Sequence, residues 1–387
     1  MKLRRMALIG VALLVAVAPH AFFGVLYFGG DSLPRLGRHG DVRVVNGGGG
    51  FIQLAPADAF APAPQENASS PEELRGLRGA VVPVREYTII GPHSHDNLSI
   101  YLIHGTDTLK GQRVMPLQTA LAQNKALVRE GAITIDNFAA VPVFIQAGDI
   151  IKGGNQDRTL PYDHLVAPGV QQLPLNAFCV EQGRSFPRGN EISHSFQTST
   201  EQLPGKKLHL AARYRQNQND VWNGVRDVQV ALARNVGGSV QAPLSQTSLQ
   251  LTLEHDRVQR ALASYFDGLA AQAMQEKDVI GVAVAINGEI QSADVYASSS
   301  LFQELWPKLL KANGVAALAE KKGAAAAPPS ADTVKQFLLR AEKATECRQA
   351  TIGGTLVLRQ EGSQALMYDT CDRGQQNLVV HRSFLAK

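Results

Sequence analysis

Residues 279–286 of this 387-residue chain read Val-Ile-Gly-Val-Ala-Val-Ala-Ile, and Asn287-Gly288 follows at once. A nearly continuous apolar run of this length predicts a strand. The Asn-Gly pair predicts a hairpin turn directly after it. The segment before the run predicts an amphipathic helix, because its apolar residues recur at every third or fourth position. These residues are Val258, Leu262, Phe266, Leu269 and Ala273.

The segment after the hairpin predicts further helices and strands. Ser300 and Gln303 form a capping-box pattern that opens a helix, and Asn313-Gly314 is a typical end for it. Residues 323–331 contain four consecutive alanines and two prolines and predict a surface loop, after which Asp332 begins another helix. About 55 residues after that loop are few for an independent domain, so we expect the C-terminal strands to join the main sheet. These strands are predicted at 355–358, 365–368 and 378–381.

Upstream of residue 258 the pattern changes from strands to helices. Residues 81–184 are mainly short β-branched or apolar runs separated by turn signals, and residues 207–234 have a helical pattern. The sequence therefore predicts an α+β fold. We expect a single large domain over residues 81–387, with mixed β-sheets and several amphipathic helices.

The N-terminus predicts a membrane anchor or a signal peptide within residues 1–28. Residues 6–28 contain no Asp, Glu, Lys or Arg, and three of the five residues before them are basic. This run is long enough to cross a bilayer as a helix, and the basic residues would remain in the cytoplasm. The alternative is a cleaved signal peptide. Its Ala16-Val17-Ala18 motif is followed at once by Pro19, which is a poor context for cleavage.

Both alternatives give the same expectation for location. The membrane is the expected partner of residues 6–28, and the main domain lies outside the cytoplasm, or is exported if the segment is cleaved. Residues 29–80 predict a flexible tether, because they contain the glycine run 47–50 and a stretch rich in alanine and proline. No pattern in the sequence predicts a protein partner or an oligomeric state.

Composition excludes two broad classes. With 44% hydrophobic residues the chain can form a core, which excludes wholesale disorder. The formal net charge of +4 is small, so we expect no nucleic-acid partner. A local basic cluster predicts a solvated helix face. It consists of Lys206, Lys207, Arg213 and Arg215.

Metal binding is also not expected. His93 and His95 would share one face of a strand, with His104 nearby, and two imidazoles so placed can bind an ion. Histidines in a loop after Gly91-Pro92 are common without a metal, and no glutamate follows before Glu130. We therefore predict no metal and no cofactor.

The densest polar segment, residues 149–184, is the predicted ligand site. Its two arginines could bind phosphate or carboxylate through paired hydrogen bonds. The predicted ligand-binding residues are Asn155, Gln156, Arg158, Glu181 and Arg184. The alternative, which the residue types favour, is structural, because arginine–carboxylate pairs with hydrogen-bonded amides can lock β-turns.

The three cysteines allow two further hypotheses. Cys179 could act as a nucleophile with His164 and Asp157, although a cysteine between two apolar residues is usually inert. Cys347 and Cys371 lie 24 positions apart and could form a disulfide in an oxidising compartment. No established motif for catalysis or phosphate binding is present, so the sequence leaves open whether the protein is an enzyme.

Several segments together resemble one family, the ARG and Rhodanese-Phosphatase-superfamily-associated Protein domain, ARPP-1. They follow the family's order over roughly residues 93–387, which favours one domain. The main pieces are Gly148-Asp149-Ile-Ile-Lys-Gly-Gly-Asn-Gln156-Asp-Arg158, Cys179-Val180-Glu181-Gln182-Gly183-Arg184, Asn287-Gly288-Glu289, Leu301-Phe302-Gln-Glu-Leu305-Trp306-Pro307-Lys-Leu309-Leu310 and Val379-Val380-His381-Arg-Ser-Phe384.

The resemblance implies a link to nucleotide or NAD-derived chemistry, because the family is named after neighbours of the ADP-ribosylglycohydrolase and phosphatase types. It brings no established catalytic residues. Ser185 stands where the family usually has an aromatic residue, which could alter a ligand pocket. Two functions follow as expectations. One is a ligand-binding or interaction module, with a small phosphorylated or nucleotide-like ligand. The other is a hydrolase acting on a nucleotide or ADP-ribose-like substrate.

Overall fold

The computed structural model describes residues 44–46, 52–54, 64–274, 276–323 and 326–387. They all belong to one compact unit, Arg43–Lys387. Strands β1 (Val44–Asn46) and β2 (Ile52–Leu54) pair as a short antiparallel hairpin at its start. The remaining elements combine sheets and helices, which confirms the α+β prediction.

A nine-stranded sheet forms the centre of this unit, and all of its neighbouring strands are antiparallel. In their order across the sheet, the strands are β3 (Asn67–Ser69), β18 (Glu346–Ile352), β19 (Thr355–Glu361), β20 (Ala365–Asp372), β21 (Leu378–Ala386), β17 (Glu289–Tyr296), β16 (Val279–Ile286), β5 (Leu98–His104) and β4 (Thr88–His95). The predicted strand 279–286 is β16, and its hairpin partner is β17. The C-terminal strands join this sheet as predicted. The structure has four C-terminal strands where three were predicted, because the polar segment β18 also pairs with β19.

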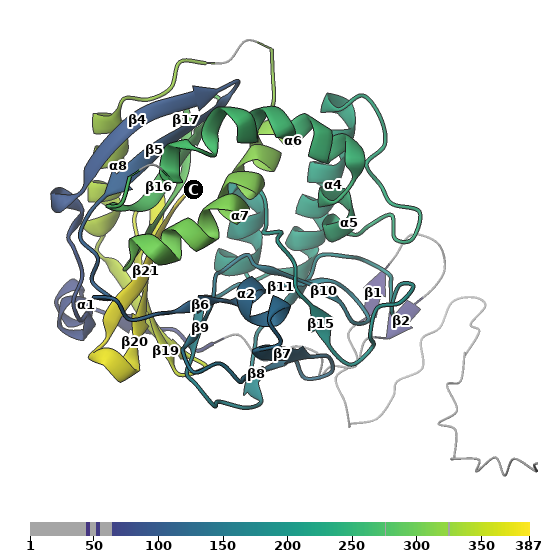
Figure 1. Ribbon diagram of the computed structural model, residues 1–387, viewed down its shortest axis with the longest axis horizontal. Helices are drawn as coiled ribbons and strands as arrows, with labels where there is room; N and C mark the ends of the chain where they lie inside the picture. The colour runs from purple at the N-terminus through teal and green to yellow at the C-terminus, as the bar shows by residue number, and fades with distance from the viewer. Residues whose placement is uncertain (1–43, 47–51, 55–63, 275, 324–325) are drawn as a thin grey trace, which may run out of the picture. The chain divides into compact units, whose positions relative to one another are not determined.

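Helices cover both faces of the sheet, as Figure 1 shows. One face packs against α3 (Gly205–His209), α4 (Gln218–Asn235), α5 (Leu249–Leu253), α6 (Asp256–Leu269) and α7 (Ser299–Ala319). The other face packs against α8 (Ala331–Glu342). Alternate residues of β16 enter the two cores: Val282 and Val284 contribute to the first, Ala283 and Ala285 to the second. Burial on both faces explains why the strand is apolar without alternation.

Helix α7 is longer than the sequence predicts. It continues past Asn313-Gly314 to Ala319. Gly314 lies against α6, where an added Cβ would approach Leu262 Cδ2 to 3.2 Å. The Asn313 side chain donates to the Leu309 carbonyl within the same helix. This glycine therefore permits close packing of two helices and does not end the helix.

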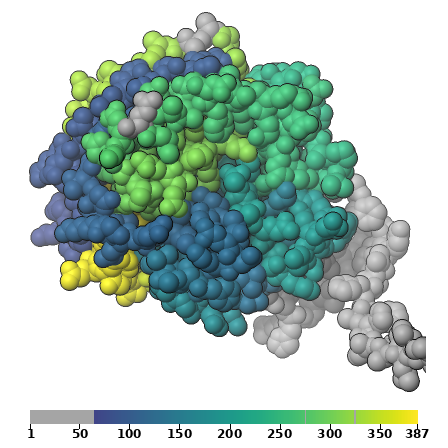
Figure 2. All heavy atoms as spheres, viewed as in Figure 1, coloured from purple at the N-terminus to yellow at the C-terminus, as the bar shows by residue number. Residues whose placement is uncertain are grey.

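A smaller β unit, residues 115–197, is inserted between β5 and α3. It contains three small sheets with their own apolar core. One sheet is mixed, because its strands β6 and β9 are parallel; this is the mixed pairing that the structure confirms. The strands are β6 (Met115–Pro116), β7 (Ala126–Arg129), β8 (Thr134–Asn137), β9 (Val143–Ile145), β10 (Ile150–Gly153), β11 (Arg158–Thr159), β12 (His164–Val166), β13 (Leu173–Pro174), β14 (Phe178–Cys179) and β15 (Phe196–Gln197), with helix α2 (Leu117–Ala122). Figure 2 shows its blue-to-teal atoms lying directly against the green atoms of the helices.

The predicted tether 29–80 includes a part that is folded. Strand β3 pairs with β18, and helix α1 (Pro71–Leu77) follows it with a capping box between Ser70 and Glu73. Leu74 is buried beside Cys347 and Leu358. The sequence pattern does not predict these elements, because only two apolar side chains, Leu74 and Leu77, pack the helix against the cluster.

The predicted anchor lies outside the described residues. Within the described ranges, no helix combines the length and apolar character that crossing a bilayer requires. The anchor or signal at residues 1–28 stays a prediction.

The predicted disulfide between Cys347 and Cys371 is not formed. Both cysteines are buried and free. They lie on β18 and β20, which flank β19, where they pair with Gln360 and Leu356 respectively. Two strand spacings amount to about 10 Å, whereas a disulfide requires Cα atoms within about 7 Å.

We predict that Phe302→Ala lowers the free energy of unfolding by about 3–5 kcal/mol, the usual cost of emptying a buried aromatic site. Phe302 is fully buried on α7 and contacts the rings of Tyr296 and Trp306. Urea unfolding measures the change. Glu304→Ala, at an exposed position of the same helix, is the control and should change stability little. Equal effects of the two variants would contradict this account of the core.

Candidate functional site

The predicted ligand residues Glu181 and Arg184 belong to a buried ion network. Arg184 Nη2 lies 2.8 Å from Glu181 Oε2, and its Nη1 donates to the carbonyls of Gly154 and Phe186. Arg188, which the sequence did not single out, pairs with Asp157 at 2.5 Å. Since these charged groups bind one another, their geometry favours the structural alternative for this segment.

The other predicted ligand residues lie in the turn between β10 and β11 and just after it. Asn155 and Gln156 are half-buried in the turn. Arg158 is buried on β11, where it contacts the Cys179 sulfur and lies 3.7 Å from Glu130. The turn side chains could still reach a ligand, so their role stays a prediction.

The proposed catalytic set of Cys179, His164 and Asp157 is not assembled. The Asp157 carboxylate accepts hydrogen bonds from Gly153 N, from Arg188 and from Ser248. Neither ring nitrogen of His164 has a hydrogen-bond partner among the described residues. Burial lowers the pKa of His164 to about 4 and raises the pKa of the Cys179 thiol. This environment favours the inert-core alternative for Cys179.

The three histidines considered as a metal cluster are separated. His93 and His95 pair with Ile100 and Leu98 near one end of the β4–β5 pair, whereas His104 pairs with Thr88 at the other end. The antiparallel register of the two strands therefore places His104 away from the other two.

A second polar cluster joins the β unit to the main sheet. His381 on β21 donates from Nδ1 to Asp163 Oδ2 at 2.8 Å and from Nε2 to Asp294 Oδ1 at 3.1 Å. Asp163 precedes β12 in the β unit and also accepts from Thr370 Oγ1 at 2.6 Å. The Tyr296 ring stacks on the imidazole, with centroids 4.5 Å apart. The imidazole is thus held between two carboxylates.

The charges in this cluster support one another. Burial alone would lower the pKa of His381, but the charge and hydrogen bond of Asp163, with a further hydrogen bond to Asp294, raise it to about 9. Burial alone would raise the pKa of Asp163, but His381 and Arg213 hold it below its ordinary value. At neutral pH His381 is therefore an imidazolium that donates from both nitrogens.

A cavity of about 50 Å³ lies beside Asp294 and His381, and we call it the Asp294 pocket. A water molecule needs about 10–15 Å³ of such volume, so the cavity can hold a few waters or one small polar group. Its polar lining includes Gln146, Gln202, Lys206, His209, Arg213, Gln291, Ser292, Asp294, Asn313, His381 and Ser383.

Arg213 is a buried donor in this pocket, contrary to the solvated face predicted for its cluster. It lies in η3 (Leu210–Tyr214), a π-helical turn, and donates from Nη1 to Ser383 Oγ at 2.7 Å. Its Nε has no hydrogen-bond partner among the described residues. The π-helical turn shifts the phase of the helix, so a period of 3.6 residues misplaces this side chain.

Sequence reasoning missed the site residues Asp163, Asp294 and His381. The available signal was the family-like segments that contain Asp149, Lys308 and His381. Two of these residues, Asp149 and Lys308, form a buried ion pair between the β unit and α7. Segments distant in sequence thus meet at the boundary between the β unit and the rest of the fold.

The family model of the ARG and Rhodanese-Phosphatase-superfamily-associated Protein domain, ARPP-1, matches residues 86–385. The chain belongs to this family. No curated protein and no solved structure matches the chain.

We predict that Arg184→Ala destabilises the protein by about 3–5 kcal/mol, because it leaves the buried carboxylate of Glu181 without its closest partner. Urea unfolding measures the loss. Gln182→Ala, in the same turn but exposed, should change stability little. A stable Arg184→Ala protein that loses a ligand would instead support the ligand-binding role of this residue.

The raised pKa of His381 makes stability depend on pH. Its folded value of about 9 exceeds the ordinary 6.5, so its stabilisation is complete below about pH 6.5 and is lost as the pH rises through about 9. We expect a loss of up to about 3 kcal/mol across this window. Urea unfolding from pH 6 to 10 tests this, and His381→Gln should show a smaller fall in stability than the wild type, because only the contribution of the buried cysteine thiols remains. An NMR titration that places the imidazole pKa near its ordinary value would contradict the prediction.

Proposed function

We propose that this ARPP-1 domain is a ligand-binding module whose Asp294 pocket takes the phosphate of a small phosphorylated or nucleotide-like ligand. The observation that carries the proposal is the convergence of cationic groups on one cavity. Arg213 and Lys206 line it as donors, and the His381 imidazolium adds positive charge although its two N–H groups already donate to Asp163 and Asp294. Asp294 is the single carboxylate of the lining. Such a set of donors suits an anion.

Unpartnered polar atoms in the lining give further support. Arg213 Nε and Gln291 Oε1 are buried without hydrogen-bond partners among the described residues. Buried polar atoms of folded proteins are normally hydrogen-bonded. A polar group bound in the pocket would supply the missing hydrogen bonds. Lys206 is half-buried, and the Asp294 side chain is 17% exposed, which gives a ligand access from solvent.

The sequence supports a location for this module. The apolar run 6–28 after basic residues supports a location of the domain outside the cytoplasmic membrane, anchored or exported. A ligand available there would be an extracytoplasmic phosphate compound.

A thermal-shift titration of the full chain tests the proposal, with inorganic phosphate, AMP and ADP-ribose as probes. Binding to the folded state raises the melting temperature, and the stabilisation grows with the logarithm of the free ligand concentration once this exceeds the Kd. We expect at least one probe to stabilise the protein and Lys206→Gln to weaken that binding about tenfold, the loss of one charge-assisted hydrogen bond. Lys207→Gln is the matched control, because Lys207 lines a neighbouring groove instead.

Two outcomes would count against the proposal. One is the absence of any stabilisation at millimolar concentrations of all three probes. The other is an equal loss of affinity in both lysine variants, which would indicate a general charge effect.

One observation favours a hydrolase as the second candidate. The His381 imidazolium holds the Asp294 carboxylate at 3.1 Å while that carboxylate lines the pocket. A carboxylate so oriented could accept a proton from a water that attacks the ligand. If the protein is a hydrolase, Asp294→Asn should retain binding of the probe and abolish the release of product. Binding without turnover in the wild type would leave the module non-catalytic.

A further inference from the structure

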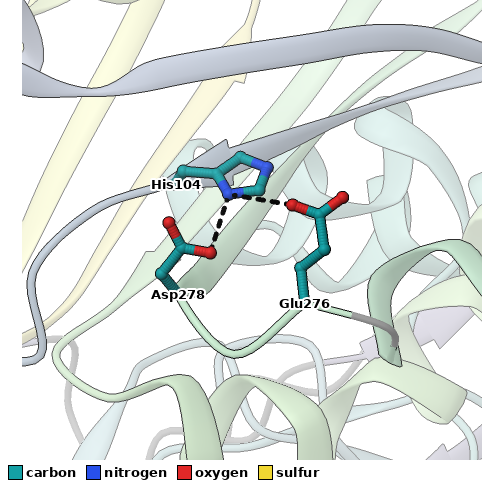
Figure 3. Close-up of side chains that lie close together, drawn as sticks. All are labelled: His104, Glu276 and Asp278. Atoms are coloured by element: carbon teal, nitrogen blue, oxygen red, sulfur yellow. Dashed lines mark hydrogen bonds and ion pairs between the residues drawn. The ribbon is translucent and has the colours of Figure 1, made fainter.

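Three side chains that can bind a metal ion meet at the end of β5, and none of them lines the Asp294 pocket of the proposed function. Figure 3 shows His104 facing Asp278 and Glu276. His104 ends β5, and Asp278 directly precedes β16. The two segments are joined by a hydrogen bond of 3.1 Å from Gly105 N to the Asp278 carbonyl, so the backbone of two neighbouring central strands positions the cluster.

The distances between the donor atoms fit one cation. His104 Nδ1 lies 3.1 Å from Asp278 Oδ1 and 3.6 Å from Glu276 Oε2. One donor atom from each residue can be chosen so that all three lie within 4.8 Å of one another. Zinc bonds of about 2.1 Å give ligand separations of about 3.4 Å in a tetrahedral site. The distances from His104 Nδ1 to the two carboxylates, 3.1 and 3.6 Å, lie just below and just above this separation. A cation would therefore require no rearrangement of the backbone.

The charge of the cluster also points to a cation. Among the ion pairs of the described residues, Glu276 and Asp278 have His104 as their partner and no lysine or arginine. A single Nδ1–H can donate to one carboxylate, and the Glu276 contact at 3.6 Å is longer than a hydrogen bond. A divalent cation at this point would neutralise both carboxylates.

We propose that His104, Glu276 and Asp278 bind a divalent transition-metal cation such as Zn²⁺ or Mn²⁺. One imidazole with two carboxylates is a donor set that suits these ions. His104 is 6% exposed, so the sheet holds its ring in place, whereas the Glu276 and Asp278 side chains are 51% and 65% exposed. Solvent can therefore reach the ion and complete its coordination. The proposal departs from the sequence-based expectation of no metal. In the structure the neighbours of His104 are the carboxylates of Glu276 and Asp278 and not His93 and His95.

Equilibrium titration of the tag-free, chelator-treated full chain with Zn²⁺ and with Mn²⁺ tests the site. We expect one high-affinity site per chain. Glu276→Gln with Asp278→Asn should weaken binding by more than about tenfold, since even loss of an outer-shell partner costs that much. Both side chains are exposed, so this double variant should fold. Glu86→Gln with Asp267→Asn, also at exposed positions, makes the same change in net charge and should leave affinity unchanged.

Co²⁺ substitution provides the second readout. Imidazole and carboxylate ligands give visible d–d absorption without the near-ultraviolet charge-transfer band of a cobalt–thiolate bond. Unchanged affinity in the Glu276→Gln, Asp278→Asn variant, equal losses in the control, a thiolate band, or no binding at millimolar cation would each overturn the proposal. In those cases His104 would serve as a hydrogen-bond donor to Asp278 alone.

Discussion

The hydrogen bond between Asp163 and His381 is the contact on which the candidate pocket depends. It joins a loop of the β unit to a central strand of the main sheet, across 218 positions of sequence. Arg213 and Thr370 approach the same carboxylate from a helix and from β20. Without this contact the β unit would lose one of its charged attachments, of which the Asp149–Lys308 pair is another, and His381 in the lining of the Asp294 pocket would lose an acceptor.

Burying such charges costs free energy, so each buried charge requires well-placed partners. An ion removed from water loses several kcal/mol of hydration, which the partner charge recovers only with good geometry. Here the imidazolium has an acceptor at each nitrogen, and Asp163 accepts from a backbone amide as well. A satisfied network of this kind fixes one relative placement of its elements more strongly than apolar packing alone. The Asp157–Arg188 network of the β unit is likewise buried, with hydrogen-bonded partners for its charges.

Much of the fold was predictable because it follows local periodicity. The apolar run 279–286 became β16, the repeat 258–269 became α6, and the family resemblance is confirmed over residues 86–385. The failures have local causes. Gly314 allows α7 to pack closely on α6, and β18 is too polar to be recognised before it pairs. The candidate site was less predictable. The charged segment 149–184 was the predicted ligand site, but its arginines and carboxylates form ion pairs with one another.

The sequence alone determined the α+β class, the family and the presence of an apolar, uncharged N-terminal segment, since these depend on composition, period and ordered motifs. Only the tertiary structure decided which polar residues meet. Strand register separates Cys347 from Cys371 and His104 from His93, and it brings His104 beside Asp278 instead. The packing of the β unit on the sheet places Asp163 against His381. Contacts between distant segments arise from the register of the strands and the packing of layers. Neither produces a periodic pattern in the sequence from which the contact could be predicted.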